Sequence, residues 1–552
     1  MPSVGVPGAQ AVSQDRRRRP SNSTGVKMFR RTPPIAIAAP LRRRRLAIVL
    51  FWLLLAALCA APSAAAADRI YWAEYDGAAI SWANLDGSGG GDLHTAGAPM
   101  DGPMGLAIDS AAGRLYWVNY GTNGSGTGTT ISWANLNGSG GGKLTTDATI
   151  QGPHGIAIDP STERIYWTND GTTPNTISYA NLDGSGGGVL PTGAATVNGP
   201  RGLALDLRTH RIYWANHDGY TISYANLDGS GGGNLNTTGA TLPYDAEGVA
   251  IDPVAERIYW GTLCANGKPF PDKISYANLD GSGGGDLNTM GATLDCPHGV
   301  AVDPVARRVY WANYYDPEKN LGRISWANPN GSGGRDLRTA GATVHGAAMP
   351  VLLKQPAPVG AAGLQGNPSP RAKLSCTPGR WAGDLLGSLL YRAPQRFSFR
   401  WRRGRHLIRR ARSSALKPRR IGDYRCVARA SNAAGSSSQA SNPLAVFKVG
   451  RARLRPGGTA ARLKVAVPDP GRLVLRTGDV GQRHPGRAGR AAVARKVRRG
   501  EVWLPVKLTA RIRRRLRHRG RVKLKASVIY VPRGEQAEHQ SRTLVLNGRR
   551  GS

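Results

Sequence analysis

The chain has 552 residues, more than one hydrophobic core usually supports, so we expect several domains. Its 73 glycines and only 6 phenylalanines argue against a helical protein and favour short strands with tight turns. The net charge of +39 is unevenly distributed. Residues 68–350 hold 27 acidic and 16 basic side chains, a net −11, whereas the rest of the chain holds 8 acidic and 58 basic ones, a net +50. This asymmetry predicts different partners for the two parts, unless the arginines only solvate the surface.

Residues 1–67 have the pattern of an export signal. Four arginines at 42–45 precede an apolar run at 46–61, and small residues suited to cleavage follow at 62–67. The apolar run is shorter than the roughly 20 residues that a bilayer span needs. We therefore predict a signal peptide with an extended basic leader, an extracellular or cell-surface protein, and no stable membrane span after cleavage. A retained signal anchor is the alternative.

One sequence motif, Arg-Ile-Tyr-Trp or a close variant, recurs through the next part of the chain. Its six copies lie at intervals of 45 to 51 residues, with the aromatic pairs Tyr71-Trp72, Tyr116-Trp117, Tyr166-Trp167, Tyr213-Trp214, Tyr259-Trp260 and Tyr310-Trp311. A period of about 40–50 residues is typical of one blade of a β-propeller. Consecutive large apolar residues point to both faces of a strand, and a blade has neighbours that cover both faces. A six-bladed propeller over residues 68–353 is therefore predicted.

The third copy shows the four strands that each repeat predicts. Pro153–Asp159 fits a first strand, Arg164–Asn169 a second and 176–182 a third; 183–186 has hairpin-turn chemistry, and a fourth strand opens at Val189. The first copy begins directly on a second strand, at Arg69. We expect the run 342–351, after the sixth copy, to supply the missing innermost strand of the first blade and so to close the ring.

Two sets of residues fit the taper of a propeller, in which blades crowd at the axis and diverge away from it. A glycine recurs in the first strands and is expected at the axis, and a large ring recurs on the third strands and is expected further out. The glycines are Gly105, Gly155, Gly202, Gly248 and Gly299, and the rings are Trp82, Trp133, Tyr179, Tyr224, Tyr276 and Trp326.

The repeated pattern is Pro-x-Gly-Leu-Ala-Ile-Asp, then Ile-Tyr-Trp-Thr, then Ile-x-x-Ala-Asn-Leu-Asp-Gly-Ser, with minor variants. It resembles the YWTD, or low-density-lipoprotein-receptor class B, repeats of TolB-like six-bladed propellers. The resemblance covers residues 68–350 and implies a rigid extracellular binding platform. The family's Asp after Tyr-Trp-Thr is replaced here, and the replacements are Glu74, Asn119, Asn169, Asn216, Thr262 and Asn313. An amide network is therefore expected instead, and the ligands of eukaryotic receptors do not transfer.

The residue between Pro and Gly differs from blade to blade and is expected at the mouth of the axial channel. From the second blade to the sixth it is Met104, His154, Arg201, Glu247 and His298, which are the ligand-binding candidates; the first blade offers Ala348, with His345 nearby. A His, Glu and Arg cluster in a concave mouth suits acid–base chemistry or anion binding. Here the chain is weakly similar to virginiamycin B lyase and to senescence-marker-type lactonases. That similarity implies His154, Glu247 and His298 as catalytic candidates with a divalent metal; otherwise no metal or cofactor is expected.

Four cysteines remain after the signal is removed, an even number that favours disulfides in an exported protein. Cys264 follows a second strand and Cys296 precedes a first strand. In a four-stranded meander these loops lie on one face, so the two thiols are expected to form a disulfide that joins adjacent blades. Two free thiols are the alternative, and metal binding by Cys264, Cys296 and His298 is a third, although their spacing matches no zinc motif.

The basic half begins after a Pro-rich linker at 354–370. Cys376, Trp401, Tyr424 and Cys426 then follow with a spacing that resembles an immunoglobulin-like sandwich, with a Cys376–Cys426 disulfide, a core tryptophan and a tyrosine corner. This domain is predicted over 371–448.

Residues 450–552 alternate apolar side chains with arginine or lysine. Alternation of period two predicts a second small β-sandwich with one solvent-exposed, basic face. Ile512 and Leu516 permit one short helix within 509–518.

These patterns predict an all-β chain in which a six-bladed β-propeller precedes an Ig-like sandwich and a second small sandwich. We expect a secreted bacterial surface protein whose propeller is a non-catalytic binding or adhesion module for an unknown protein or glycan. The basic sandwiches would act as a spacer or as a tether to anionic cell-wall polymers. Nucleic acid is not expected, because recognition aromatics and a reading helix are missing from the pattern. The alternative is a metal-dependent lyase or lactone hydrolase with its site at the channel mouth.

Overall fold

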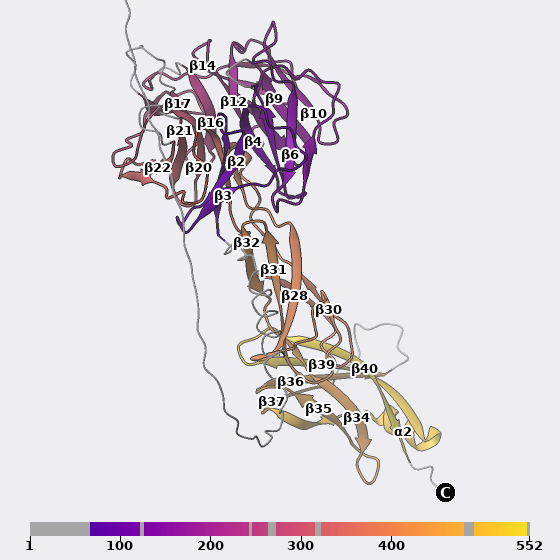
Figure 1. Cartoon of the computed structure of the whole chain (residues 1–552). Coiled ribbons are helices and arrows are strands. Elements are labelled where there is room, and N and C mark those ends of the chain that lie inside the picture. Colours follow the sequence, from indigo (N-terminus) through magenta and orange to yellow (C-terminus); the bar gives the residue numbers. More distant parts are fainter. Residues whose placement is uncertain are drawn as a thin grey trace, which may run out of the picture. The chain divides into compact units, whose positions relative to one another are not determined.

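The computed structural model describes residues 67–121, 126–241, 245–262, 272–314, 322–479 and 491–548. No helix in these ranges is long and apolar enough to cross a membrane. The predicted signal peptide, apart from its last residue, and Cys264 lie outside the described residues. The described part is built almost entirely of β-strands (Figure 1).

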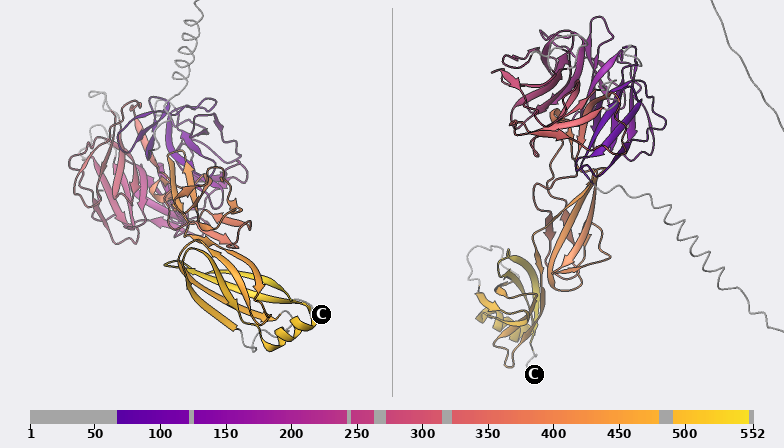
Figure 2. Two further views of the ribbon diagram at one scale, coloured as in Figure 1. Left: turned by 90° about the horizontal axis from the view of Figure 1, so that it is seen from below. Right: turned by 60° about the vertical axis from the view of Figure 1, so that its left-hand side comes forward.

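The N-terminal domain is a ring of six sheets, each with four antiparallel strands in its meander (Figures 1 and 2). The innermost strands are β4 (Pro103–Asp109), β8 (Pro153–Asp159), β12 (Pro200–Asp206), β16 (Ala246–Asp252), β20 (Pro297–Asp303) and β24 (Ala347–Leu353). The second strands, which carry the Tyr-Trp pairs, are β1 (Arg69–Glu74), β5 (Arg114–Asn119), β9 (Arg164–Asn169), β13 (Arg211–Asn216), β17 (Arg257–Thr262) and β21 (Arg308–Asn313).

The third strands are β2 (Ala79–Asn84), β6 (Thr130–Asn135), β10 (Thr176–Asn181), β14 (Thr221–Asn226), β18 (Lys273–Asn278) and β22 (Arg323–Ala327). The outermost strands are β3 (Gly90–Asp92), β7 (Gly141–Lys143), β11 (Gly188–Val189), β15 (Gly232–Asn234), β19 (Gly284–Asp286) and β23 (Gly334–Asp336). The sequence pattern placed the start of the fourth strand of the third blade at Val189, and β11 begins one residue earlier, at Gly188.

The ring closes through its last strand, as predicted. β24 pairs antiparallel with β1, so the first blade combines one strand from the end of the repeat region with three from its beginning. Each innermost strand contacts the innermost strands of both neighbouring blades, and β24 contacts β4 and β20. No blade in the ring therefore has an unprotected edge at the axis.

Burial explains why this sequence forms a propeller. All six tryptophans of the Tyr-Trp pairs are completely buried, and their tyrosines are at most 2% exposed. At the axis, a Cβ on Gly202 would lie 2.6 Å from the Cα atom of Gly248, and a Cβ on Gly155 would lie 2.8 Å from the Cα atom of Gly202. The glycines thus allow the blades to meet where space is smallest.

Polar side chains complete the blades in the positions where the family has Asp. In the third blade, Asn169 accepts the backbone N–H of Gln151 at 3.0 Å and donates to the hydroxyl groups of Thr176 and Ser178 at 3.0 and 2.9 Å. Asn119, Asn216 and Asn313 make corresponding bonds. The expected amide network is therefore present in four blades.

A short segment that follows the ring closes one end of its axis. The 3-10 helix η2 (Leu386–Ser388) leads into β27 (Leu390–Tyr391), which pairs parallel with β24. The Ser388 hydroxyl donates to the carbonyl of Ile251 at 2.6 Å, near the last residue of β16. Leu389 lines the small cavity of about 10 Å³ that remains on the axis. The hydrogen bond from Ser388 thus lies near the C-terminal ends of the innermost strands, whereas the Pro-x-Gly residues lie at their N-terminal ends.

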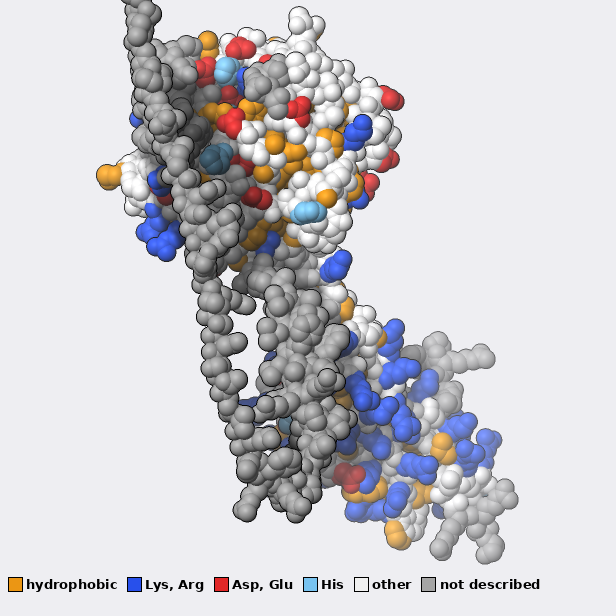
Figure 3. All heavy atoms as spheres, viewed as in Figure 1, with side chains coloured by type: hydrophobic (Ala, Val, Ile, Leu, Met, Phe, Trp, Pro, Cys, Tyr) orange, Lys and Arg blue, Asp and Glu red, His pale blue; other side chains and the backbone are white. Residues whose placement is uncertain are grey.

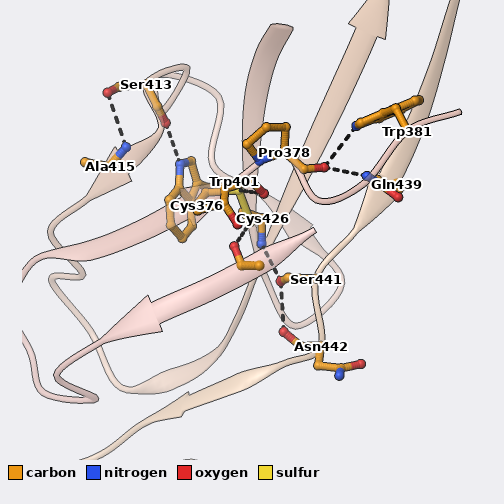
Figure 4. Close-up of a disulfide and its surroundings, with 12 residues drawn as sticks. Cys376, Pro378, Trp381, Trp401, Ser413, Ala415, Cys426, Gln439, Ser441 and Asn442 are labelled. Atoms are coloured by element: carbon orange, nitrogen blue, oxygen red, sulfur yellow. Dashed lines mark hydrogen bonds between the residues drawn. A yellow bond between two sulfur atoms is a disulfide. The ribbon is translucent and has the colours of Figure 1, made fainter. Parts of the chain in front are cut away.

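The region after the ring contains a disulfide between Cys376 and Cys426 (Figure 4). One sheet holds β25 (Gly363–Gly366), β26 (Leu374–Thr377) and β30 (Ala415–Leu416); the other holds β28 (Arg396–Arg403), β29 (His406–Leu407), β31 (Gly422–Asn432), β32 (Gly435–Ala440) and β33 (Leu444–Val446). Trp401 is buried beside the disulfide and donates to the Ser413 carbonyl, and the Tyr424 hydroxyl donates to the Arg420 carbonyl. These features match the predicted core, and the immunoglobulin-like assignment itself stays a prediction.

The C-terminal region has two sheets and one helix. One sheet holds β34 (Lys448–Leu454), β35 (Ala461–Val467) and β38 (Gly500–Val506); the other holds β36 (Gly471–Asp479), β37 (Ala491–Val497), β39 (Arg521–Pro532) and β40 (Glu538–Asn547). The predicted short helix is α2 (Ala510–Arg519), capped by the Thr509 hydroxyl, with Ile512 and Leu516 buried.

Candidate functional site

Three side chains from the Pro-x-Gly positions of different blades meet on the axis. They are His154 at the start of β8, Glu247 at the start of β16 and His298 at the start of β20. Nε2 of His154 lies 3.0 Å from Oε2 of Glu247, and Nε2 of His298 lies 3.8 Å from the same oxygen. The two imidazole rings stack with centroids 6.0 Å apart, although they belong to opposite blades. We call these three residues the axial cluster.

The axial cluster is buried, yet its polar atoms are left without hydrogen bonds. His154, Glu247 and His298 are 0%, 2% and 4% exposed. Within the described residues, neither nitrogen of His154, nor Oε2 of Glu247, nor Nδ1 of His298 has a hydrogen-bond partner of acceptable geometry. Unsatisfied polar atoms at this depth cost free energy, and such groups in a native protein call for a bound species or an exchangeable proton.

The spacing of the cluster fits a divalent cation. One donor atom from each residue lies within 4.8 Å of the other two. Neighbouring ligands around a metal with bonds of about 2.0–2.4 Å are about 3–3.5 Å apart, so the 3.0 Å separation fits and the others need a small inward rotation of an imidazole. Two histidines and one carboxylate form a donor set typical of zinc sites that keep a coordination position open, and they do not suit calcium or magnesium.

The protonation states of the cluster also suit metal binding. Burial, together with the positive charge of Arg201, lowers the pKa of His154 to about 3, although the neighbouring Glu247 acts to raise it. Burial likewise lowers the pKa of His298. Burial raises the pKa of Glu247, but Arg201 and the two imidazoles outweigh it and hold that pKa well below its usual value. Neutral imidazoles and an ionised carboxylate are the forms that bind metals.

Arg201 lies beside the cluster and is held by an acid from the neighbouring blade. Its Nη2 is 3.3 Å from Oδ2 of Asp170, and both side chains are only slightly exposed, at 13% and 14%. The Tyr120 hydroxyl donates to the same Oδ2 of Asp170 at 3.1 Å, and the guanidinium of Arg201 lies over the Tyr120 ring. This arrangement holds a positive charge that acts on the anionic Glu247.

A second group of residues at the mouth was missed by the sequence interpretation. His217 lies with Nε2 at 3.5 Å from Asp245 and at 3.8 Å from Oε1 of Glu247, and its side chain is 23% exposed. Tyr314 stacks on His298 with centroids 5.3 Å apart. Tyr120, Asp170, His217 and Tyr314 each follow the last residue of a second strand. In an antiparallel blade the second strand ends beside the start of the first strand. The variable residue that follows each second strand was therefore a sequence signal for residues at the mouth.

The remaining predicted residues lie outside the cluster. Met104 and Ala348 are buried among apolar side chains of the core, and His345 is exposed with its backbone N–H bonded to Glu74. Cys296 is disulfide-bonded, and the predicted partner, Cys264, lies outside the described residues. Asp272, Asp295 and Cys296 are also close enough for metal binding, but a disulfide sulfur is not an available thiolate ligand.

Solved structures with similar folds are propellers or contain them. A nidogen–laminin complex has a chain 18% identical in sequence, aligned over 49% of this chain and 99% of that chain with a TM-score of 0.37. TolB from Acinetobacter baumannii is 14% identical over 58% and 74% of the two chains, with a TM-score of 0.38. A provisionally assigned 6-phosphogluconolactonase from Bacteroides uniformis is 13% identical over 52% and 99%, with a TM-score of 0.35.

These likenesses are too distant to carry an activity or a ligand. No family model matches the sequence, and no curated protein matches it. The architecture rests instead on the chain's own repeats and strand order. By these, its N-terminal domain is a six-bladed β-propeller.

Proposed function

We propose that this protein is an exported binding protein whose propeller holds a divalent cation in the axial cluster and captures an anionic ligand at the mouth above it. The observation that carries the proposal is the meeting of three buried side chains, His154, Glu247 and His298, whose donor atoms lie within 4.8 Å of one another, while both nitrogens of His154 and Oε2 of Glu247 lack hydrogen bonds. A cation would satisfy all three donors at once. Without one, an ionised Glu247 would be buried against imidazoles alone, with His154 at 3.0 Å and His298 and His217 at 3.8 Å.

The surroundings of the cluster support an anionic ligand. Arg201 and His217 are the partly exposed groups nearest to Glu247, and a guanidinium held by Asp170 can bind a carboxylate or phosphate without first losing side-chain freedom. The far end of the axis is closed by Leu389 and the segment around it. A ligand therefore has one route to the cluster, from the Pro-x-Gly end.

Export and surface attachment complete the proposal. The export-signal pattern of residues 1–67, the Cys376–Cys426 disulfide and the disulfide-bonded Cys296 all suit an extracellular protein. The basic half, a spacer or tether in this scheme, would hold the propeller on anionic polymers of the cell wall.

The second candidate function is a metal-dependent lyase or lactone hydrolase. One specific observation favours it, the pairing of a two-histidine, one-carboxylate donor set with a further histidine, His217, at its exposed side. A bound cation would polarise a carbonyl or phosphoryl oxygen. His217 would then be the side chain placed to accept or donate a proton, and Arg201 would orient an anionic substrate.

The metal content of the purified protein tests the proposal. We expect about one zinc-class ion per chain, retained through gel filtration. His298→Ala should lose most of that metal, whereas His94→Ala, which removes an exposed histidine of the same propeller, should keep it. A wild-type protein that neither retains nor rebinds a divalent cation, in mass spectrometry and in titration, would contradict the proposal.

Hydrolysis or elimination assays separate the two candidate functions. A panel of lactones and cyclic esters is incubated with the metal-loaded protein, with the metal-free protein and with His217→Gln. Turnover that needs both the metal and His217 favours the enzyme. Binding of anionic metabolites or glycans that needs the metal and Arg201, without turnover, favours the binding protein.

A further inference from the structure

A strongly basic hollow of the described chain lies outside the propeller. Arginine dominates the stretch 402–420, which holds eight arginines and one lysine within nineteen residues. Figure 3 shows lysine and arginine side chains gathered over the C-terminal half of the chain, in contrast to the propeller. Two adjoining hollows follow this stretch, one of about 1280 Å³ and one of about 710 Å³. They share Arg403, His406, Arg419 and Arg420, so we treat them as one groove and call it the basic groove.

The charge of the basic groove is not neutralised from within. The smaller hollow is lined by Arg403, Arg410, Arg412, Lys417, Arg419 and Arg420, and no acidic residue lines it. The larger hollow adds Arg371, Arg405, Lys448, Arg499 and Arg542 against two acids, Asp423 and Asp469. None of these bases has an ion pair with a carboxylate in the described part of the chain. So many unpaired guanidinium groups repel one another and lower their energy when an external anion lies between them.

Buried contacts lie beside the larger hollow of the basic groove. Gln540 is 6% exposed, and its amide donates to the carbonyls of Pro368 and Phe447 at 2.7 Å each. Phe447 is fully buried and packs on Tyr530 with ring centroids 5.5 Å apart. These contacts join β40 to the segments just before β26 and just after β33.

The chemistry of the lining selects the kind of polyanion. Arginine binds phosphate and carboxylate groups in a bidentate manner and stays charged at any physiological pH. Both volumes equal or exceed what a single drug-sized molecule fills, and bases line them throughout, which suits a chain of repeated charges. Among the residues that line the two hollows, Tyr424 is the one Phe, Tyr or Trp and is 2% exposed, the imidazole of His406 is the one exposed ring, and α2 does not line the groove. Bases of single-stranded nucleic acid need exposed aromatic surfaces, and duplexes are usually read by a helix or ribbon in a groove.

We infer that the basic groove is a binding site for a linear, non-nucleotide polyanion with repeated phosphate or carboxylate groups, such as a charged glycopolymer of a cell envelope. Arg405, Arg419 and Arg420 are its central exposed contacts. The inference is independent of the axial cluster. It locates the tethering surface, so loss of metal binding leaves it intact.

The test uses the full chain and matched triple variants. Arg405, Arg419 and Arg420 are changed together to Gln in one variant, and the exposed Arg462, Arg472 and Arg476, which line neither hollow, are changed to Gln in the other. The two variants carry the same net charge, and circular dichroism and thermal unfolding establish that both are folded. Binding to labelled inorganic polyphosphate and to labelled poly-glutamate is measured by fluorescence anisotropy between 50 and 300 mM salt, roughly the range over which counterion effects dominate.

The groove variant should bind at least about tenfold more weakly than the wild type, and the slope of log K against log salt should fall by about two, since each lost contact to a flexible polyanion contributes about 0.7. The control variant should stay within about twofold of the wild type. Tighter binding of polyphosphate than of poly-glutamate identifies phosphate as the repeated group, and the reverse identifies carboxylate. Equal losses in both triple variants would overturn the inference, since the charge would then act diffusely. Tighter, groove-dependent binding of single-stranded DNA of equal charge would also overturn it.

Discussion

The propeller and the basic half are both made of antiparallel β-sheets, but their strands are buried in opposite ways. In β9 five consecutive residues are buried, because neighbouring blades cover both faces of the sheet. In β39 buried residues alternate with exposed or half-exposed ones along twelve residues, and many of the exposed ones are basic. The propeller has a net charge of −11 over 68–350, whereas the remainder of the chain has +50. Where both faces are buried, the repeated residues form the core and function is left to the residues that differ. Where one face of the sheet is exposed to solvent, the repeated residues themselves form the functional surface.

The largest expected effect is the loss of a ring tryptophan. Trp214 is fully buried, and its indole N–H donates to the carbonyl of Thr196 and to Asn216. Trp214→Ala should destabilise the propeller by about 4–5 kcal/mol in calorimetric unfolding, because it leaves a large cavity and unpaired acceptors. Trp503→Ala, at a half-buried position of β38, should cost about 1 kcal/mol. Equal costs for the two variants would contradict the difference in burial between the regions.

The disulfide should stabilise only the region that contains it. Cys376 and Cys426 close a loop of 50 residues, for which the unfolded-state entropy model gives about 4 kcal/mol. The double variant Cys376→Ala and Cys426→Ala should lower the unfolding transition of the region around Trp401 and leave the propeller's transition unchanged. The exposed neighbours Ser375→Ala and Arg425→Gln form the matched control. A shift of the propeller's transition by the same amount would show that the two regions unfold as one.

A smaller effect should come from replacing the arginine that begins the second strand of each blade. In every blade this arginine lies over the aromatic ring of the third strand, as Arg211 does over Tyr224 with 4.5 Å to the ring centroid. Arg211→Gln should destabilise the propeller by about 0.5–1 kcal/mol, the usual range for an exposed cation–π pair. Lys143→Gln, at an exposed position of an outermost strand, should have almost no effect. An equal loss of stability in both variants would show that the arginine acts only through its charge and not through its contact with the ring.

The fold of the propeller could be predicted because local periodicity and tertiary burial agree in it. The Tyr-Trp pairs, the axial glycines and the closing strand β24 all follow from one repeated pattern. The arginine stacking could not be predicted, because it pairs residues on different strands whose register is set only in the folded blade. Leu389 and Ser388 were also missed, since a short segment outside the repeats has no periodic signal.

The candidate site was predictable in its location and less so in its composition. Ring symmetry brings equivalent positions to the axis, so the sequence alone predicts the Pro-x-Gly residues as candidates. Symmetry does not say which side chains are long enough to meet there. Met104 turns into the apolar core, while His217, from a different position in the repeat, reaches Glu247. Contacts of that kind depend on side-chain length and on loop paths that differ from blade to blade.

The pH dependence of zinc binding tests most directly the claim that the axial cluster is preset for a cation. Burial lowers the pKa of His154 to about 3, so zinc need not displace a proton from that imidazole at pH 5, and burial lowers the pKa of His298 as well. Competition titration should therefore give zinc affinities at pH 5 and pH 7 that differ by less than about tenfold. Two exposed histidines with the ordinary pKa of about 6.5 would lose roughly 500-fold over the same interval. A loss of that size, or no zinc binding at either pH, would contradict the account.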